Sequence, residues 1–339
     1  MKPFIFYISL SVVLLSCKNE TNLLKSSSKS DKTEYANTLF IQKFEDFTIV
    51  KILKPWQRAD NEIFTYILAK SEFQIPDSLS KFNYIQIPVK SVICFSTTHI
   101  GFINALQKTE TIKGISGKDY FFDALLRDNF NNGEVFDIGY HPALDYEKII
   151  DINPDIVFLY GLEASVGGIA IRLSNAGIPS VMVAEFLEDH PLGKAEWIKL
   201  FSLLFDCEEK GDTIFEMVKN NYLNLKNRID KITEKPFILT GLPWKETWYM
   251  TGGDSFMAKF IQDAGGEFLW KENNSKDFFP LSLESVYSKS LEADIWINCG
   301  TATSLNDLIS RDERFKNIGA VKQKNVFNNK TYVVNNYLL

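Results

Sequence analysis

Several features that mark common classes of protein are scarce or missing in this sequence. Its 339 residues include only four cysteines and three histidines. The cysteines are far apart and none forms a CxxC pair, which excludes a zinc knot and a disulfide scaffold. The GxSxG, HExxH, GxxxxGKS/T and GxGxxG motifs are absent, so the sequence carries no signature of a nucleophile elbow, a zinc protease, a phosphate-binding loop or a dinucleotide fold.

The sequence also lacks a large excess of charge of either sign. The chain has 37 Lys and Arg against 43 Asp and Glu, which gives a formal net charge of −6. Like charges do not gather in blocks, and neutralising phosphates requires clustered Lys and Arg, so nucleic acid is not expected as a partner. With 45% hydrophobic and 14% aromatic residues, the chain can bury one large core or two ordinary ones.

The first residues have the pattern of an export signal. Lys2 precedes an apolar run over residues 4–15 that is too short to span a bilayer. The run leads into Leu-Leu-Ser-Cys, and a polar stretch rich in Ser and Lys follows. This pattern resembles a bacterial lipoprotein signal, in which Cys17 is lipidated; the alternative is a secretory signal with a chance cysteine. We expect a signal peptide over residues 1–16, a flexible tether over residues 17–34, and an extracytoplasmic protein anchored to a membrane.

Strands and helices alternate in the first part of the chain. Residues 35–90 contain two runs of alternating apolar residues, which predict an N-terminal β hairpin. Between residues 91 and 190, strand and helix patterns follow one another, which predicts a parallel sheet covered on both faces. The strands are expected at 92–95, 114–115, 135–138, 156–160 and 180–183, and the helices at 99–107, 121–127, 146–150 and 169–176.

A long helical stretch then interrupts the alternation. Residues 191–234 have apolar residues at helical spacing, with a break near 207–211, and predict a helical spine. The predicted fold is therefore α/β, with two Rossmann-like lobes, 91–190 and 235–339, joined by a long rigid helix. In the second lobe, strands are expected at 237–240, 248–250, 268–270, 295–298 and 332–334, and helices at 255–264, 283–288 and 305–311.

The two lobes contain a matching segment. Residues 144–161 align with residues 281–300 when a two-residue gap is allowed, and both end in a buried strand that begins with Asp-Ile and closes on Gly. Glu147 and Glu284 occupy the same place in this match, near the start of a helix. A carboxylate in the first helical turn interacts favourably with the helix dipole, which alone would account for both residues.

The order of these segments is similar to that of one protein family. The segments in question are VICFSTTH at 92–99, GYHPALDYEKI at 139–149, NPDIVF at 153–158, WYMTGGDS at 248–255, DAGG at 263–266 and PLSLESV at 280–286. In these segments and their order, the sequence resembles the substrate-binding lipoproteins of ABC importers for iron-siderophores, haem and cobalamin, and the likeness runs from about residue 35 to the end.

This resemblance implies both a function and a set of partners. Members of the family capture a metal chelate between their lobes and deliver it to a membrane permease, without turnover. One Glu at the start of a helix in each lobe faces the permease, and Glu147 and Glu284 match these two positions. The resemblance further implies a monomer without a resident cofactor, whose ligand is a ferric siderophore, haem or a corrinoid.

The ligand is expected between the lobes, at the carboxyl ends of the strands. Aromatic side chains there would give flat apolar walls with polar edges. The alternative is that they are core residues, above all Trp248. The residues expected to touch the ligand are Ser96, His99, Tyr120, Tyr140, His141, Tyr160, Trp244, Trp248 and Trp270.

A receptor for bare Zn or Mn ions, or a metal-dependent enzyme, is the alternative from another class. His99, His141, Glu163 and Glu185 each come from a different loop after a strand, and these are residue types that ligate such metals. They include no closely spaced pair of ligands. His141 could instead be an axial ligand to a haem or corrinoid metal.

Two further segments leave questions for the structure. The Gly-Gly-Asp-Ser turn at residues 252–255 could present backbone N–H groups to an anion. Relatives in the resembled family usually continue with a helical segment after the last strand, whereas this sequence stops soon after residue 334. We therefore expect a second lobe that is either short or truncated.

Overall fold

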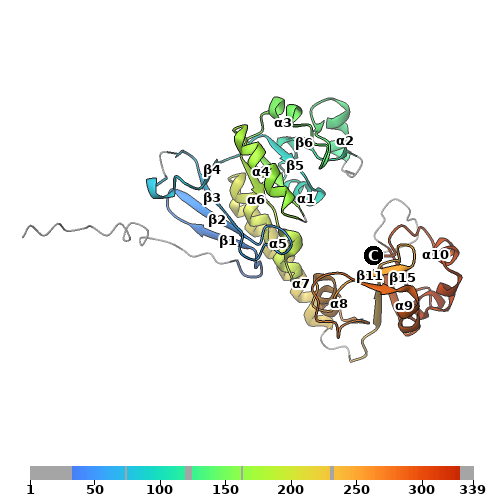
Figure 1. Cartoon of the computed structure of the whole chain (residues 1–339). Helices are drawn as coiled ribbons and strands as arrows, with labels where there is room; N and C mark the ends of the chain where they lie inside the picture. Colours follow the sequence, from blue (N-terminus) through green and yellow to red (C-terminus); the bar gives the residue numbers. More distant parts are fainter. Residues whose placement is uncertain (1–32, 73–74, 119–123, 162, 230–232, 329–339) are drawn as a thin grey trace, which may run out of the picture.

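The computed structural model of the chain describes residues 33–72, 75–118, 124–161, 163–229 and 233–328. It consists of an N-terminal sheet, a first lobe, a helical spine and a second lobe (Figure 1). Cys17, the predicted signal peptide and most of the predicted tether lie outside the described residues. Within those residues, no helix combines the length and the hydrophobicity needed to cross a membrane.

The N-terminal extension is larger than the predicted hairpin. It is a four-stranded sheet in which β1 (Leu39–Lys43), β2 (Phe47–Leu53) and β3 (Ile63–Ala69) are antiparallel neighbours and β4 (Asn83–Gln86) runs parallel to β3. An isolated two-stranded hairpin is only marginally stable in water, and the two additional strands provide a surface that can be buried.

The first lobe confirms the predicted alternation of strands and helices. Its five strands are all parallel, in the order β7-β6-β5-β8-β9. The strands are β5 (Val92–Cys94), β6 (Ile112–Ile115), β7 (Phe136–Asp137), β8 (Ile156–Leu159) and β9 (Ser180–Met182), and the helices are α1 (Thr97–Ala105), α2 (Ala124–Asn131), α3 (Tyr146–Ile152) and α4 (Ser165–Asn175).

The second lobe has a smaller parallel sheet, β12-β10-β14-β15. The predicted strand at 248–250 does not join this sheet, because β11 pairs with β13 in a separate antiparallel ribbon. The predicted strand at 332–334 lies outside the described residues. The strands are β10 (Phe237–Thr240), β11 (Thr247–Met250), β12 (Glu267–Phe268), β13 (Phe279–Ser282), β14 (Ile295–Ile297) and β15 (Val326–Phe327), and the helices are α8 (Phe256–Asp263), α9 (Leu283–Ser290), α10 (Leu305–Arg311) and α11 (Gly319–Lys322).

The segment that matches between the lobes has the same position in both sheets. In the first lobe α3 leads into β8, which pairs with the first strand β5, and in the second lobe α9 leads into β14, which pairs with the first strand β10. The internal match in the sequence therefore reflects equivalent helix–strand units.

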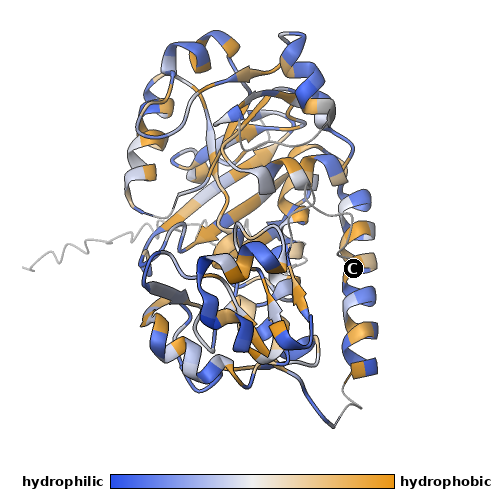
Figure 2. Ribbon diagram, turned by 90° about the vertical axis from the view of Figure 1, so that its right-hand side faces the viewer, coloured by the Kyte–Doolittle hydropathy of each residue, from blue (hydrophilic) through white to orange (hydrophobic). Residues whose placement is uncertain are grey.

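The spine is built from three helices, α5 (Pro191–Glu196), α6 (Ile198–Leu204) and α7 (Glu208–Ile229). The predicted break is present, just before α7 begins. α7 then packs closely on α6, since a Cβ added at Gly211 would lie 2.3 Å from the hydroxyl of Ser202. In Figure 2 the long helix α7 carries both hydrophobic and hydrophilic residues along its length.

Two buried carboxylates fasten the start of the N-terminal sheet, one to the spine and one to the segment just before the spine. Glu196 accepts hydrogen bonds of 2.8–2.9 Å from the backbone N–H groups of Glu34, Tyr35 and Ala36. Glu188 accepts from the backbone N–H groups of Asn37 and Thr38, at 2.7 and 3.0 Å. Carboxylate acceptors form strong charge-assisted hydrogen bonds, so these residues hold five successive residues of the chain.

The N-terminal sheet also packs behind the first lobe. The backbone N–H of Met182, in β9, donates to the hydroxyl of the buried Tyr66 at 3.0 Å. Trp56 lies over helix α4, with its ring 3.6 Å from the position that a Cβ on Gly167 would take. The sheet therefore supports both the edge strand β9 and the outer face of α4.

The Glu196→Gln variant tests the anchoring of the extension. An amide places an N–H₂ group where the carboxylate accepted hydrogen bonds, and it also loses the ion pair with Lys199 at 2.8 Å. We expect the free energy of unfolding to fall by about 2–4 kcal/mol, measured by urea denaturation.

The matched control is Glu216→Gln, which removes a carboxylate whose side chain is 51% exposed and pairs with Lys219. Surface pairs contribute about 0–1 kcal/mol, so this variant should unfold close to the wild type. Equal losses in the two variants would contradict the anchoring role of Glu196.

Candidate functional site

A pocket of about 540 Å³ opens at the carboxyl ends of the strands of the first lobe. Its residues follow strands β5, β6, β7 and β8 and continue into the first turns of α4. This is the location expected for a ligand site in a parallel α/β sheet. The lining residues are Phe95, Ser116, Tyr140, His141, Tyr160, Gly161, Glu163, Ser165, Val166 and Ile169.

Asp137 and Ser116 shape one side of this pocket. The carboxylate of Asp137 accepts hydrogen bonds from the backbone N–H groups of Gly117 and Gly139, at 3.1 and 3.0 Å. The Ser116 hydroxyl donates to the Gly139 carbonyl at 2.8 Å. Gly139 has φ +70°, and a Cβ there would lie 2.5 Å from the carbonyl oxygen of Ala143. These contacts fix the loop that presents Tyr140 and His141.

The other side of the pocket is set by the turn after β8. Gly161 lies so close to α4 that an added Cβ would be 2.5 Å from the Cβ of Val166. The ring of Tyr160 packs edge-on against Phe186, with ring centroids 5.9 Å apart. Tyr160 therefore has one supported edge while 40% of the residue remains exposed.

The structure brings three of the predicted ligand residues together. Tyr140, His141 and Tyr160 all line the pocket, and Tyr140 is 60% exposed. Ser96 is at the N-cap of α1, where its hydroxyl accepts from the backbone N–H of Thr98 at 3.3 Å. Tyr120 lies outside the described residues.

His99 does not fit its predicted role. It is fully buried between the rings of Phe158 and Phe201, at centroid distances of 5.8 and 6.3 Å. Neither of its ring nitrogens has a hydrogen-bond partner. The first turn of α1 points this side chain into the core and not toward the pocket, so a ligand in the pocket cannot reach it.

The three predicted tryptophans of the second lobe have different environments. Trp244 is 65% exposed, with the ammonium of Lys245 4.7 Å from its ring centroid. Trp270 is half-buried against the core of the lobe. Trp248 is a core residue whose indole N–H donates to the carbonyl of Thr240 at 3.0 Å, so its predicted contact with ligand is wrong.

The described residues do not assemble the metal site of the alternative reading. Among the described residues, no group of three or more His, Cys, Asp or Glu is placed to hold a metal ion. His141 and Glu163 share the pocket, but His99 is in the core and Glu185 is buried with a hydrogen bond of 2.6 Å from the Thr98 hydroxyl. Burial raises the pKa of the Glu185 carboxyl despite this hydrogen bond.

Two backbone N–H groups of the Gly-Gly-Asp-Ser turn donate hydrogen bonds to carbonyl groups of the second lobe. The N–H of Gly253 donates to the carbonyl of Asn273 at 2.7 Å, and the N–H of Asp254 donates to the carbonyl of Ser275 at 3.0 Å. A Cβ on Gly252 would lie 1.9 Å from the Ser275 carbonyl oxygen. The turn packs against a neighbouring loop, and these two donors are not free for an anion.

Glu147 and Glu284 lie in equivalent positions, each exposed in the first turn of a helix. The helices begin in the same way, because the side chains of Asp145 and Ser282 accept hydrogen bonds from the backbone N–H three residues later, at 2.9 and 3.2 Å. Glu284 also lies 3.5 Å from Arg314 of its own lobe.

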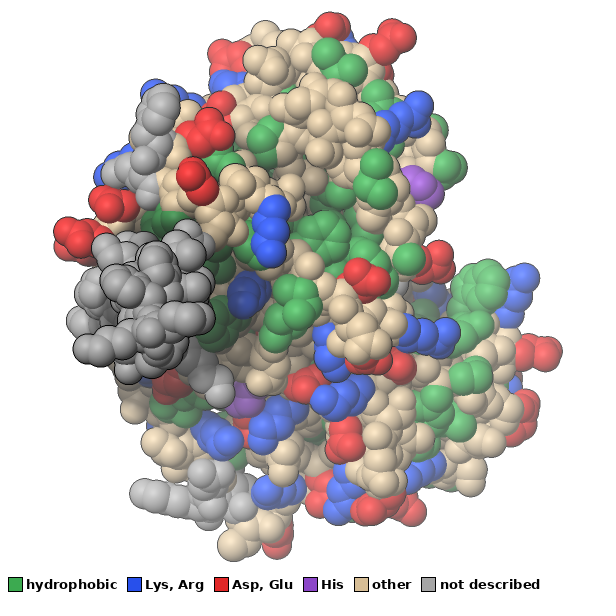
Figure 3. All heavy atoms as spheres, turned by 60° about the vertical axis from the view of Figure 1, so that its left-hand side comes forward, with side chains coloured by type: hydrophobic (Ala, Val, Ile, Leu, Met, Phe, Trp, Pro, Cys, Tyr) green, Lys and Arg blue, Asp and Glu red, His purple; other side chains and the backbone are tan. Residues whose placement is uncertain are grey.

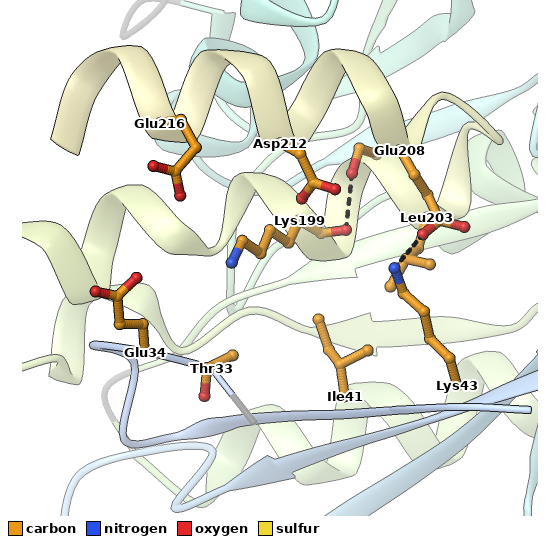
Figure 4. A pocket seen from close by; sticks show the side chains of 10 residues that line it. Thr33, Glu34, Ile41, Lys43, Lys199, Leu203, Glu208, Asp212 and Glu216 are labelled. Atoms are coloured by element: carbon orange, nitrogen blue, oxygen red, sulfur yellow. Dashed lines mark hydrogen bonds and ion pairs between the residues drawn. The ribbon is translucent and has the colours of Figure 1, made fainter. Parts of the chain in front are cut away.

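A second pocket, of about 470 Å³, lies between β1 and the spine (Figure 4). Most of its charged side chains are paired. Lys43 pairs with Glu208, which also lines the pocket, whereas Lys199 pairs with Glu196, and Glu34 and Glu216 pair with Lys219, outside the lining. This second pocket does not lie at the carboxyl ends of the strands.

On the face drawn in Figure 3, acidic and basic side chains are interspersed.

The chain is similar to known proteins in sequence and in fold. A model of the Periplasmic binding protein family matches residues 92–332. An uncharacterized lipoprotein from Methanocaldococcus jannaschii is 28% identical over 258 residues, which cover 73% of this chain and 61% of that protein. A periplasmic heme-binding protein from Vibrio cholerae has a TM-score of 0.58 at 14% identity, covering 73% of this chain and 92% of that one. A possible iron-binding periplasmic solute-binding protein from Staphylococcus epidermidis has a TM-score of 0.56 at 19% identity, covering 71% and 90%.

The family match covers most of the chain, and the protein therefore belongs to the Periplasmic binding protein family. The resemblance inferred from the sequence motifs is confirmed at this level. The match begins at β5, so the N-terminal sheet lies outside it. The similarity to solved structures supports the two-lobed fold.

The buried His99 makes the stability of the protein depend on pH. Burial lowers the pKa of His99 to about 3, below the ordinary value of about 6.5. The unfolded chain therefore binds a proton that the folded chain does not, and stability falls as the pH decreases below about 6.5. Replacing His99 by Phe should stabilise the protein by about 2 kcal/mol more at pH 5 than at pH 7.5, measured by urea unfolding at the two pH values.

The control for this variant is His141→Phe, because His141 is exposed in the pocket. A gain for His99→Phe that is the same at both pH values would contradict the buried neutral histidine.

Proposed function

We propose that this protein is the extracytoplasmic substrate-binding component of an ABC import system, that it captures a metal chelate, and that it delivers the chelate to a membrane permease. The observation that carries this proposal is the pocket at the strand ends, which two exposed tyrosines line in a chain of the periplasmic binding protein family. The protein binds and releases its ligand without turnover.

The chemistry of the pocket suits a large ligand with flat or apolar surfaces. The rings of Tyr140 and Tyr160 offer apolar faces with hydroxyl groups at their edges, and His141 and Glu163 add polar groups. A ferric siderophore presents such a combination of surfaces, and haem or a corrinoid is the alternative. In the haem or corrinoid case, His141 is the residue that would ligate the metal.

The second lobe contributes the opposite wall in this proposal. Trp244 is the most exposed of the three predicted tryptophans, and a large exposed aromatic side chain is the kind of residue that gains most from covering a ligand. The proposed ligand contacts are therefore Tyr140, His141 and Tyr160 from the first lobe and Trp244 and Trp270 from the second.

Delivery requires recognition by the permease. We propose that Glu147 and Glu284 pair with basic side chains of the permease, one from each lobe. Both carboxylates are exposed at capped helix starts, which holds them at defined positions. Two separated charges orient a partner and steer its approach without a large apolar interface.

The localisation belongs to the same proposal. The lipoprotein-like signal over residues 1–16, followed by Cys17, supports a location outside the cytoplasm, with the protein tethered by lipid to a membrane. The name of the relative from Methanocaldococcus jannaschii, a lipoprotein, supports this placement.

Ligand titration tests the capture step. The chain from Lys18 onward is titrated with ferric siderophores, haemin and cyanocobalamin while the fluorescence of its six tryptophans is followed. We expect saturable quenching by one of them with a submicromolar Kd. Tyr160→Ala should weaken that Kd at least tenfold, or about 1.4 kcal/mol.

The control is Tyr84→Ala, which removes an aromatic ring of β4 outside the pocket, and it should bind like the wild type. If no chelate saturates the protein, or if Tyr160→Ala binds normally, the proposed capture site is wrong.

The docking step is tested by the double variant Glu147→Ala/Glu284→Ala. Uptake of the identified chelate into proteoliposomes that contain the permease should be abolished, because both charged contacts are removed, while the Kd for the chelate stays unchanged. Asp151→Ala/Glu292→Ala is the control, since it removes two exposed carboxylates, one near the end of α3 and one just after α9. Loss of chelate binding in the first variant would contradict a role in docking alone.

A further inference from the structure

The carboxylate of Asp263 is a meeting point of the second lobe and the spine. Asp263 is the last residue of α8 and is only 7% exposed. Its Oδ2 accepts a hydrogen bond of 2.8 Å from the hydroxyl of Tyr222, and its Oδ1 lies 2.9 Å from the ammonium of Lys226. Both donors belong to α7, so a buried carboxylate of the second lobe is held by two side chains of the spine.

Two more groups face the same carboxylate. Lys259, one turn earlier in α8, lies 3.1 Å from Oδ1. His190, at the N-cap of α5, lies 3.7 Å from Oδ2 through its Nε2. Burial by itself raises the pKa of Asp263, but hydrogen bonds from Lys226, Tyr222 and Lys259 outweigh it and hold the pKa below its usual value. The carboxylate is therefore charged at neutral pH, and α5, α7 and α8 all contribute to its environment.

The backbone beyond Asp263 closes on the end of α7. Gly265 has φ +83°, and a Cβ there would lie 2.0 Å from the Cγ2 of Ile229, the last residue of α7. The rings of Tyr222 and Phe260 stack with centroids 6.4 Å apart. The contact between α8 and the C-terminal half of α7 is thus close as well as polar, and Figure 1 shows the two helices side by side.

The other end of α7 is fixed to the first lobe. Phe215 is buried in the core that includes the first sheet, and Gly211 packs directly on Ser202 of α6. One helix is therefore attached to the first lobe at its start and to the second lobe at its end. α7 therefore links the two lobes, and Asp263 is the buried charge at the attachment of α7 to the second lobe.

We infer that Asp263 is a positioning residue, which fixes the second lobe on the spine and thereby sets the spacing between Glu147 and Glu284. This inference rests on the proposed function, because that spacing matters only if both carboxylates meet one permease. A receptor whose lobes adopt many relative positions presents the correct spacing only part of the time. Its apparent affinity for the permease falls by that fraction.

The spacing is measured by pulsed electron paramagnetic resonance between two spin labels. The labels are attached at Asp151→Cys and Glu292→Cys, which are exposed near α3 and α9, in a chain from Lys18 onward that carries Cys207→Ser. Cys94 and Cys299 are buried and stay unlabelled. Asp263→Asn should broaden the distribution of distances between the labels, because an amide N–H₂ group faces the ammonium of Lys226.

Asp307→Asn is the matched control. Asp307 belongs to α10 of the same lobe and pairs with Arg311 within that helix, at 3.1 Å. It should leave the distance distribution unchanged. If Asp263→Asn fails to fold, Tyr222→Phe and Lys226→Met each remove one donor and should broaden the distribution separately. A distribution identical to the wild type in all folded variants overturns the inference.

Uptake kinetics test positioning when the receptor concentration counts only folded protein, determined by circular dichroism, because an unfolded fraction by itself raises the total concentration needed for half-maximal uptake. Without spin labels, Asp263→Asn should raise the receptor concentration that gives half-maximal uptake at least tenfold and leave the maximal rate unchanged. A fall in maximal rate alone, at a normal half-maximal concentration, would contradict positioning, as would a broadened distribution with normal uptake. If Glu147→Ala/Glu284→Ala itself supports normal uptake, the proposed docking is wrong, and the distance measurement still reports on Asp263.

Discussion

The architecture depends on buried carboxylates in the short stretch of chain that leaves the first lobe. Glu188 and Glu196 are buried there, and each accepts backbone hydrogen bonds from the start of the N-terminal sheet. Glu188 also accepts from the indole N–H of the buried Trp197 at 3.0 Å. A buried charge without partners would be very costly, so these acids require the segments that they hold. Between them, His190 faces Asp263 and Lys194 lies 4.1 Å from the ring centroid of Phe256 in the second lobe. All four parts of the molecule therefore meet around residues 188–197.

Capture and delivery use different parts of the fold in the proposed function. The pocket depends on loops after the strands, where Asp137 and Gly139 fix the backbone. The docking carboxylates depend on helix starts, where Asp145 and Ser282 supply the caps. Because the two sets of residues are held by separate local contacts, the ligand preference of such a receptor can change without loss of the permease contact.

Periodicity and local sequence rules predicted much of this structure. The alternation of strand and helix patterns predicted the parallel sheet of the first lobe. The patterns at helix starts correctly placed Glu147 and Glu284 in the first turns of α3 and α9. The misplaced residues have a common cause. Residue type does not report which way a side chain points from its element, so His99 and Trp248 are suitable for a ligand by chemistry but are buried by orientation. Local sequence rules also could not predict contacts between residues that are far apart in the chain. Glu196 hydrogen-bonds the backbone of Tyr35 across 161 residues, and β11 pairs with β13 and not with the main sheet.

The N-terminal sheet lies behind one wall of the pocket. Val166 and Ile169 of α4 face the pocket, while Gly167 of the same helix faces Trp56 of the extension. The helix that forms the wall is thus held from its outer side before any ligand arrives. Ordering a mobile wall would subtract from the free energy of binding. A sheet that contributes none of the pocket's lining residues can therefore contribute to affinity, by making the wall rigid in advance.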